Sequence, residues 1–263
     1  MLRAVSSGKK KTGIRQKGDE LMKIVARTDV GLLRDNNQDA YAAFELTNSA
    51  SLAVVCDGMG GAAEGALASS RAVRAIKDRI ADKYYDGMSD LSVKSLMISA
   101  VENANAEIYE LSLTDEKYNG MGTTVVAAII ANSYVYIAHA GDSRAYKISC
   151  GDVLQMTTDH SVVQRMIENG QITKEEAKDH PDKHIITRAL GVDESIKVDF
   201  AQETFDDGDI LILCSDGLTN YVGAEDILRL TEDGHYYDYA NRLVDLANQN
   251  GGGDNITVVA VQN

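Results

Sequence analysis

The chain has 263 residues, of which 44% are hydrophobic and 25% charged, and its 26 basic and 40 acidic side chains leave a formal net charge of −14. This acidic balance argues against a surface that binds nucleic acid, and the apolar content excludes a largely disordered chain. No run approaches the roughly 18 apolar residues that a membrane helix needs, and the N-terminus lacks the apolar core of a secretory signal. We therefore expect a cytoplasmic, globular protein without membrane insertion.

The first 22 residues differ in composition from the rest. Six of them are basic and two are acidic, with little apolar content, which is typical of a disordered extension. Such a tail could touch RNA or an acidic surface, but a solvated terminus, a cloning remnant or a true start at Met22 explains it more simply. We predict a disordered basic extension over residues 1–22 and one folded domain over residues 23–263.

Short β-rich runs alternate with longer helical runs from Lys23 onward, which predicts a domain of mixed α and β structure. The predicted strands are dense in Val, Ile, Tyr and Ala and are bounded by Gly, Asp or Asn. They are Ser51–Cys56, Thr123–Ala131, Tyr134–His139, Arg144–Ile148, Asp209–Cys214 and Asn255–Val261. The predicted core-facing helices are Ala66–Ile80 and Leu91–Leu111.

The three cysteines, Cys56, Cys150 and Cys214, are an odd number, and two of them lie inside apolar runs. We therefore expect no disulfide framework. None of the three begins the Cys-x5-Arg loop of cysteine-based phosphatases, which excludes that chemistry.

A more polar segment occupies residues 159–191. Val162–Asn169 and Thr173–Lys178 are predicted as two short helices, the second opened by a capping box of Thr173 and Glu176. Because the segment is inserted between strand-rich regions, we predict a flap beside a site.

Four aspartates share one sequence context, since each lies at the end of an apolar strand. They are Asp57, Asp142, Asp216 and Asp254. Any one of them alone is explained by a turn, because Asp and Gly are the usual turn residues. Several carboxylates that converge in space, however, repel each other strongly unless a hard cation or a proton neutralises them. An oxygen-only set of ligands suits Mg²⁺ or Mn²⁺ better than zinc.

The segment RDNNQDAY places Arg34 beside Asn37, Gln38 and Asp39. An arginine fork is well matched to a phosphate group. A polar turn with a surface ion pair explains the same residues equally well.

Eight motifs, in this order along the chain, resemble the metal-dependent protein phosphatase family of the 2C type, and especially its compact bacterial, eukaryotic-type Ser/Thr phosphatases. They are RDNNQD, VVCDGMGGAAEG, MGTT, AHAGDSRAY, TTDHSVV, HPDKHIITRALG, CSDGLTN and GGGDNITVV. The match spans about residues 23–262. It implies an α+β fold, a two-sheet antiparallel β-sandwich flanked by helices, with a dinuclear metal site at one end.

The resemblance also implies a set of metal ligands. Asp57 would bridge two Mn²⁺ or Mg²⁺ ions, and the carbonyl of Gly58 would bind one of them. Asp216 and Asp254 would hold the other ion. Asp142 would supply a possible third site that shares Asp216.

Three further residues receive roles at the substrate and the water from the same resemblance. Arg34 would grip the substrate phosphate, and Gln38 and Asp39 would orient the waters at the metals. Asn255 would support Asp254 from behind.

Two positions depart from the usual family pattern. Gln38 stands where members often have Glu, although an amide can still orient water. Met59 stands where many eukaryotic members have a histidine proposed to protonate the leaving oxygen, and a thioether donates no proton. His180 and His184 have a helical ligand spacing, but a proline lies between them, so we assign no histidine a catalytic role.

The expected function is metal-dependent hydrolysis of phosphoserine and phosphothreonine in proteins by metal-activated water, without a phosphoenzyme. The expected partners are phosphorylated proteins and an opposing Ser/Thr kinase, with no nucleic acid, and we expect a monomer. Two alternatives stay open: a catalytically inert member that binds phosphoproteins, and a dinuclear phosphodiesterase or nuclease, which the acidic surface disfavours.

Overall fold

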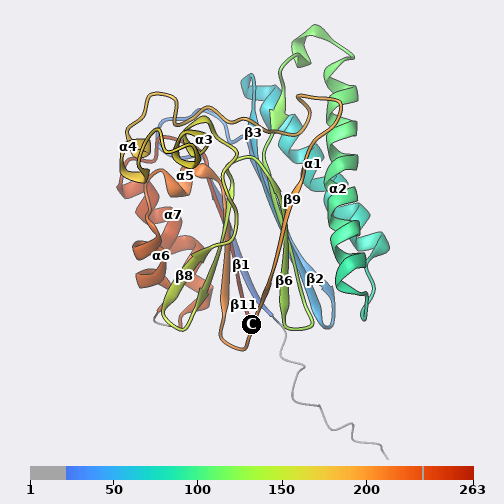
Figure 1. Ribbon diagram of the computed structural model, residues 1–263, viewed down its shortest axis with the longest axis vertical. Coiled ribbons are helices and arrows are strands. Elements are labelled where there is room, and N and C mark those ends of the chain that lie inside the picture. Colours follow the sequence, from blue (N-terminus) through green and yellow to red (C-terminus); the bar gives the residue numbers. More distant parts are fainter. Residues whose placement is uncertain (1–21, 233) are drawn as a thin grey trace, which may run out of the picture.

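The computed structural model describes residues 22–232 and 234–263 (Figure 1). The expected basic extension, residues 1–22, lies outside the described residues apart from Met22. Two antiparallel sheets pack face to face, and helices cover the outer face of each (Figure 1). The expected α+β sandwich flanked by helices is thus the observed fold.

The two sheets differ in strand order but share antiparallel pairing throughout. In the first sheet the order is β1 (Lys23–Asp29), β11 (Ile256–Gln262), β10 (Ile210–Cys214), β7 (Arg144–Ser149) and β8 (Asp152–Gln155). In the second it is β2 (Asp39–Thr47), β3 (Ala50–Met59), β5 (Val125–Ala131), β6 (Tyr134–Ala140) and β9 (Asp199–Thr204), with β4 (Gly122–Thr123) pairing with β3. As a result, β3 and β6 run in the same direction, and their C-terminal ends lie at the same end of the sheet.

Helices cover the sandwich on both sides. On the second sheet lie α1 (Ala62–Lys83) and α2 (Asp90–Ser112), and on the first lie α6 (Ala224–Thr231) and α7 (Tyr239–Gln249) (Figure 1). The short helices α3 (Val162–Glu168), α4 (Lys174–Lys178) and α5 (Asp216–Thr219) gather at one end (Figure 1). Two 3₁₀ turns complete the set, η1 (Glu116–Tyr118) and η2 (Tyr236–Asp238). No helix in the described part of the chain is long and apolar enough to cross a membrane.

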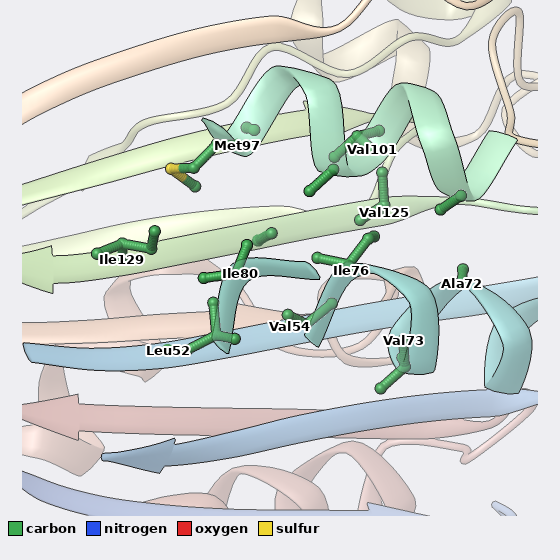
Figure 2. Packing of buried hydrophobic residues seen from close by; sticks show 14 of the residues in the cluster. Leu52, Val54, Ala72, Val73, Ile76, Ile80, Met97, Val101, Val125 and Ile129 are labelled. Atoms are coloured by element: carbon green, nitrogen blue, oxygen red, sulfur yellow. The ribbon is translucent and has the colours of Figure 1, made fainter. Parts of the chain in front are cut away.

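Strand β3 is apolar on both faces because it lies between two packed layers. Val54 packs toward α1 and α2, whereas Val55 packs toward the first sheet. Figure 2 shows the outer layer, in which α1 and α2 contribute Ile76, Ile80, Met97 and Val101 against Leu52, Val54, Val125 and Ile129 of the sheet. A fully buried strand gains hydrophobic stabilisation from consecutive residues, which is why the sequence run lacks alternation.

The predicted strands and long helices are confirmed with small shifts of their ends. The capping box of Thr173 and Glu176 is also present, and it starts α4. Four strands have no counterpart among the six predicted ranges. They are β1, β2, β8 and β9, and all lie at sheet edges, where most residues are half buried or exposed and the apolar signal is weak. The cysteines are free thiols, as expected.

Candidate metal centre and active site

Five aspartates meet at one end of the sandwich. Asp57 lies near the end of β3, and Asp39, the first residue of β2, is its partner in the ladder. Asp142 follows β6, Asp216 begins α5 directly after β10, and Asp254 precedes β11. The antiparallel order places all these positions at the same end, and a hydrogen bond from Ser215 to Asp39 joins the two sheets there (2.7 Å).

Burial and the neighbouring carboxylate charges raise the pKa of four of these groups, Asp39, Asp57, Asp142 and Asp216. Burial, followed by the charges of Asp39 and Asp216, raises the pKa of Asp57 well above its ordinary value. Burial is also the main cause that raises the pKa of Asp39 to about 7 and that of Asp142 to about 7, with the charge of Asp216 adding to both. The pKa of Asp216 is raised by burial and then by Asp254. A bound cation or added protons would therefore relieve the repulsion between these carboxylates.

Two oxygen atoms of this cluster are left for a ligand. Oδ1 of Asp39 and Oδ1 of Asp216 are buried without a hydrogen-bond partner among the described residues. Their other oxygens are held in place, because Asp39 Oδ2 accepts from Ser215 Oγ (2.7 Å) and Asp216 Oδ2 accepts from Asn220 Nδ2 (3.0 Å). Buried carboxylate oxygens without partners, in a set with only oxygen donors, fit Mg²⁺ or Mn²⁺.

Glycines let the backbone come close at this end. A Cβ on Gly58 would lie 2.1 Å from the carbonyl oxygen of Gly65 in α1, so no larger residue fits there. The N–H of Gly58 donates to the carbonyl of Gln38 (3.1 Å), and Gln38 Nε2 donates to the carbonyl of Gly61 (2.8 Å). The end of β3, the start of α1 and the segment with Gln38 are thereby held together.

Two threonines, which the sequence did not single out, fix the backbone of Asp57. The N–H of Asp57 donates to Thr124 Oγ1 (3.0 Å), and Thr123 Oγ1 donates to the Asp57 carbonyl (2.8 Å). Thr124 also shares a hydrogen bond with Ser143 (2.7 Å), the residue after Asp142. Thr123 and Thr124 both lie in the MGTT motif. Their two adjacent hydroxyl groups were the feature of the sequence from which this role could have been predicted.

Arg34 lies at the rim of the cluster. Its Nη2 is 2.9 Å from Oδ2 of Asp254, and 51% of its side chain is exposed. The guanidinium thus neutralises one carboxylate and faces solvent. This contact is compatible both with a phosphate clamp and with a surface ion pair, the two interpretations that the sequence left open.

Asn255 holds the loop that carries Arg34. Its Oδ1 accepts from the N–H of Gln38 (2.8 Å), and its Nδ2 donates to the carbonyls of Val30 and Asn36 (2.9 Å each). Its contact with Asp254 runs through the backbone, since the Asn255 N–H donates to Asp254 Oδ1 (2.9 Å). Asn255 therefore orients both the loop and a carboxylate.

A second cluster of metal-ligand types lies close to the first: the ligand atoms of His139, His160 and Asp199 are within 4.8 Å of one another. However, Nδ1 of His160 accepts from the N–H of Gly141 (3.0 Å), and Nε2 of His160 contacts Asp199 Oδ2 (3.1 Å). Burial lowers the pKa of His160 to about 4, although the hydrogen bond to Asp199 opposes this. A neutral ring with both nitrogens engaged has no lone pair left for an ion.

Comparison with known proteins places this chain in one family. The sequence profile of protein phosphatase 2C matches residues 34–254. The protein phosphatase PhpP of Streptococcus pneumoniae is 40% identical over 242 residues, covering 91% of this chain and 97% of the relative.

Solved structures agree with this result. The S. agalactiae serine/threonine phosphatase superposes with a TM-score of 0.85 at 38% identity, covering 92% of this chain and 99% of that one. The catalytic domain of the serine/threonine protein phosphatase PstP, in complex with two manganese ions, gives a TM-score of 0.81 at 33% identity, covering 92% and 98%. The chain therefore belongs to the protein phosphatase 2C family. It is a metal-dependent protein-serine/threonine phosphatase of the bacterial type.

Proposed function

We propose that the carboxylate cluster holds two divalent cations, Mn²⁺ or Mg²⁺, with a possible third. Asp57 and the carbonyl of Gly58 would bind one ion, and Asp57, Asp216 and Asp254 the other. Asp142 would bind the third, together with Asp216. The observation that carries this proposal is the half-buried aspartate cluster itself, with raised pKa values and with two buried carboxylate oxygens, Oδ1 of Asp39 and Oδ1 of Asp216, that have no hydrogen-bond partner among the described residues.

The remaining site residues would bind substrate and orient water. Arg34, half exposed beside Asp254, would hold two phosphate oxygens with its planar fork. Gln38 and Asp39 would orient the attacking water, and the hydrogen bond from Ser215 keeps the Asp39 carboxyl in one position. When bound, the cations would supply the positive charge that lowers the pKa of that water and neutralises the phosphoryl oxygens. Attack would be direct, without a phosphoenzyme.

The segment 159–191 would act as a flap that contacts the protein around the phosphorylated residue. Helices α3 and α4 lie near α5, at the end where the aspartates meet (Figure 1). Arg165 and Lys178 of this segment are exposed and basic, in a chain whose net charge is −14. We further propose that the protein acts as a cytoplasmic monomer on phosphorylated proteins, in opposition to a Ser/Thr kinase.

Phosphate release from phosphoserine and phosphothreonine peptides tests this function. We expect activity with Mn²⁺ and none after chelation, and no cleavage of a phosphodiester or of DNA. Phosphopeptide binding without turnover would support the catalytically inert alternative. Diester cleavage would support the nuclease alternative.

A further inference from the structure

His160 makes two hydrogen bonds to one residue, Gly141. The backbone N–H of His160 donates to the Gly141 carbonyl (2.9 Å), and Nδ1 of its ring accepts from the Gly141 N–H (3.0 Å). Gly141 directly precedes Asp142, and His160 is the second residue of the polar segment 159–191. The buried imidazole of His160 therefore binds the backbone of Gly141, the residue next to the candidate metal ligand Asp142.

The loop around Asp142 is held on its other side by Thr124. A Cβ on Gly141 would lie 2.6 Å from the Cβ of Thr124, and the φ of Gly141 is +115°, so this position requires glycine. Thr124 shares a hydrogen bond with Ser143 (2.7 Å). Since Gly141 and Ser143 flank Asp142, the direction of this carboxylate depends on how both neighbours are held.

The far side of the His160 ring is fixed as well. Its Nε2 lies 3.1 Å from Asp199 Oδ2, and the other oxygen of Asp199 accepts from Arg188 Nη1 (2.9 Å). The ring stacks on His139, with 4.8 Å between centroids and 6° between the planes. The His160 carbonyl accepts from the N–H of Thr187 (2.7 Å). One residue thus joins both ends of the segment 159–191 to the loop of Asp142.

The hydrogen-bond pattern defines the tautomer of His160. Nδ1 faces an N–H donor, so it carries a lone pair, and Nε2 carries the proton that is donated to Asp199. Protonation of Nδ1 would break the contact with Gly141.

We propose that His160 is a positioning residue that holds Gly141 through its neutral Nδ1, so that Asp142 faces the aspartate cluster, and that it couples the segment 159–191 to this carboxylate. The role of Asp142 as a ligand for a third cation is the part that rests on the proposed function. The hold on Gly141 itself does not depend on it.

Two substitutions separate the two sides of the ring. In His160→Asn, the side-chain oxygen can take the place of Nδ1 and accept from Gly141, while the contact with Asp199 is lost. In His160→Gln, the amide nitrogen can take the place of Nε2 and donate to Asp199, while the acceptor for Gly141 is lost. The two variants lose the same stacking on His139, so each is the matched control for the other.

We expect the Gln variant to lose affinity for Mn²⁺ at its weakest site by about threefold to tenfold, the range of one lost hydrogen bond, and the Asn variant to stay within about twofold of the native protein. Calorimetric titration measures this affinity. In metal-free protein, the amides of Gly141 and Asp142 should exchange with solvent faster in the Gln variant than in the Asn variant. Equal behaviour of the two variants in both measurements would overturn the proposal.

The unmodified protein provides a test that needs no variant to fold. In ¹⁵N-labelled protein, Nδ1 of His160 should be the unprotonated nitrogen and should show a scalar coupling across the hydrogen bond from the Gly141 amide. A protonated Nδ1, or an absent coupling, would overturn the proposal. If hydrogen exchange and coupling are as expected but Mn²⁺ affinity is the same in both variants, His160 holds Gly141 and the error lies in the ligand role of Asp142.

Discussion

Asp39 and Asp57 are directly paired across the β2–β3 ladder, so the register of two antiparallel strands brings two half-buried carboxyl groups side by side. The charges of Asp216 and Asp142 also act on Asp57. Without a cation, such a cluster destabilises the fold, because like charges in a buried site repel. The same cluster becomes favourable once it surrounds a divalent ion.

Removal of one carboxylate charge should abolish most of the activity and stabilise the metal-free fold. For Asp57→Asn and Asp216→Asn we expect the Mn²⁺-dependent rate on a phosphopeptide to fall about a hundredfold or more, since several kcal/mol of charge stabilisation are lost. The thermal midpoint in chelator should rise in both. Asp207→Asn, a change of an exposed residue at the turn before β10, is the matched control and should alter neither quantity. Near-normal turnover in either cluster variant would contradict the assignment.

The metal-free protein should lose stability as the pH rises. The pKa values of Asp39 and Asp142 are raised from 3.8 in the unfolded chain to about 7 in the fold. A raised pKa stabilises the fold fully only below the unfolded value, so this contribution is lost between about pH 4 and 7. We expect the thermal midpoint in chelator to be lower at pH 8 than at pH 5, and added Mn²⁺ to raise it more at pH 8. Asp39→Asn should weaken this pH dependence. If the variant showed the same pH dependence as the native protein, the raised pKa of Asp39 would not be its cause.

Asp142→Ala should remove the weakest cation site and leave the other two. We expect the activity to fall while the fold stays intact, because Asp57, Asp216 and Asp254 are unchanged. Calorimetric titration with Mn²⁺ should show one weak site fewer. An unchanged titration would exclude Asp142 from the ligands.

Arg34 should matter for substrate more than for metal. We expect Arg34→Ala to lower kcat/KM by roughly ten- to a thousandfold, the range of a lost charge-assisted contact of about 1.5–4 kcal/mol, with metal affinity nearly unchanged. Arg34→Lys keeps the charge without the fork and should recover only part of the rate. A variant that loses metal but binds phosphate product normally would show that the ion pair with Asp254 is the main role of Arg34.

The flap should affect large substrates only. Arg165→Ala or Lys178→Ala should change the rate on phosphoproteins more than the rate on an aryl phosphate, because a small substrate does not reach beyond the cluster. Equal effects on both substrates would count against a substrate contact by the segment 159–191.

The positions of Asp57, Asp142, Asp216 and Asp254 could be predicted because each carries a local signature, an apolar strand directly before or after the carboxylate. The residues that hold these aspartates in place could not be predicted, because their hydrogen bonds join distant parts of the chain. Ser215 contacts Asp39 across 176 residues, and Thr124 contacts Asp57 across 67. The dual contact of Asn255 with the Arg34 loop is of the same kind. The edge strands β1, β2, β8 and β9 could not be predicted, because half-buried residues give little apolar pattern.

The aspartate cluster should bind the divalent cations that the hydrolysis of phosphorylated proteins requires. An anomalous difference map from crystals grown with Mn²⁺ tests it most directly. We predict two strong peaks among Asp57, Asp216 and Asp254, with a weaker third beside Asp142. A map with no peak at the cluster, from crystals of a preparation that hydrolyses phosphopeptides with Mn²⁺, would contradict the account.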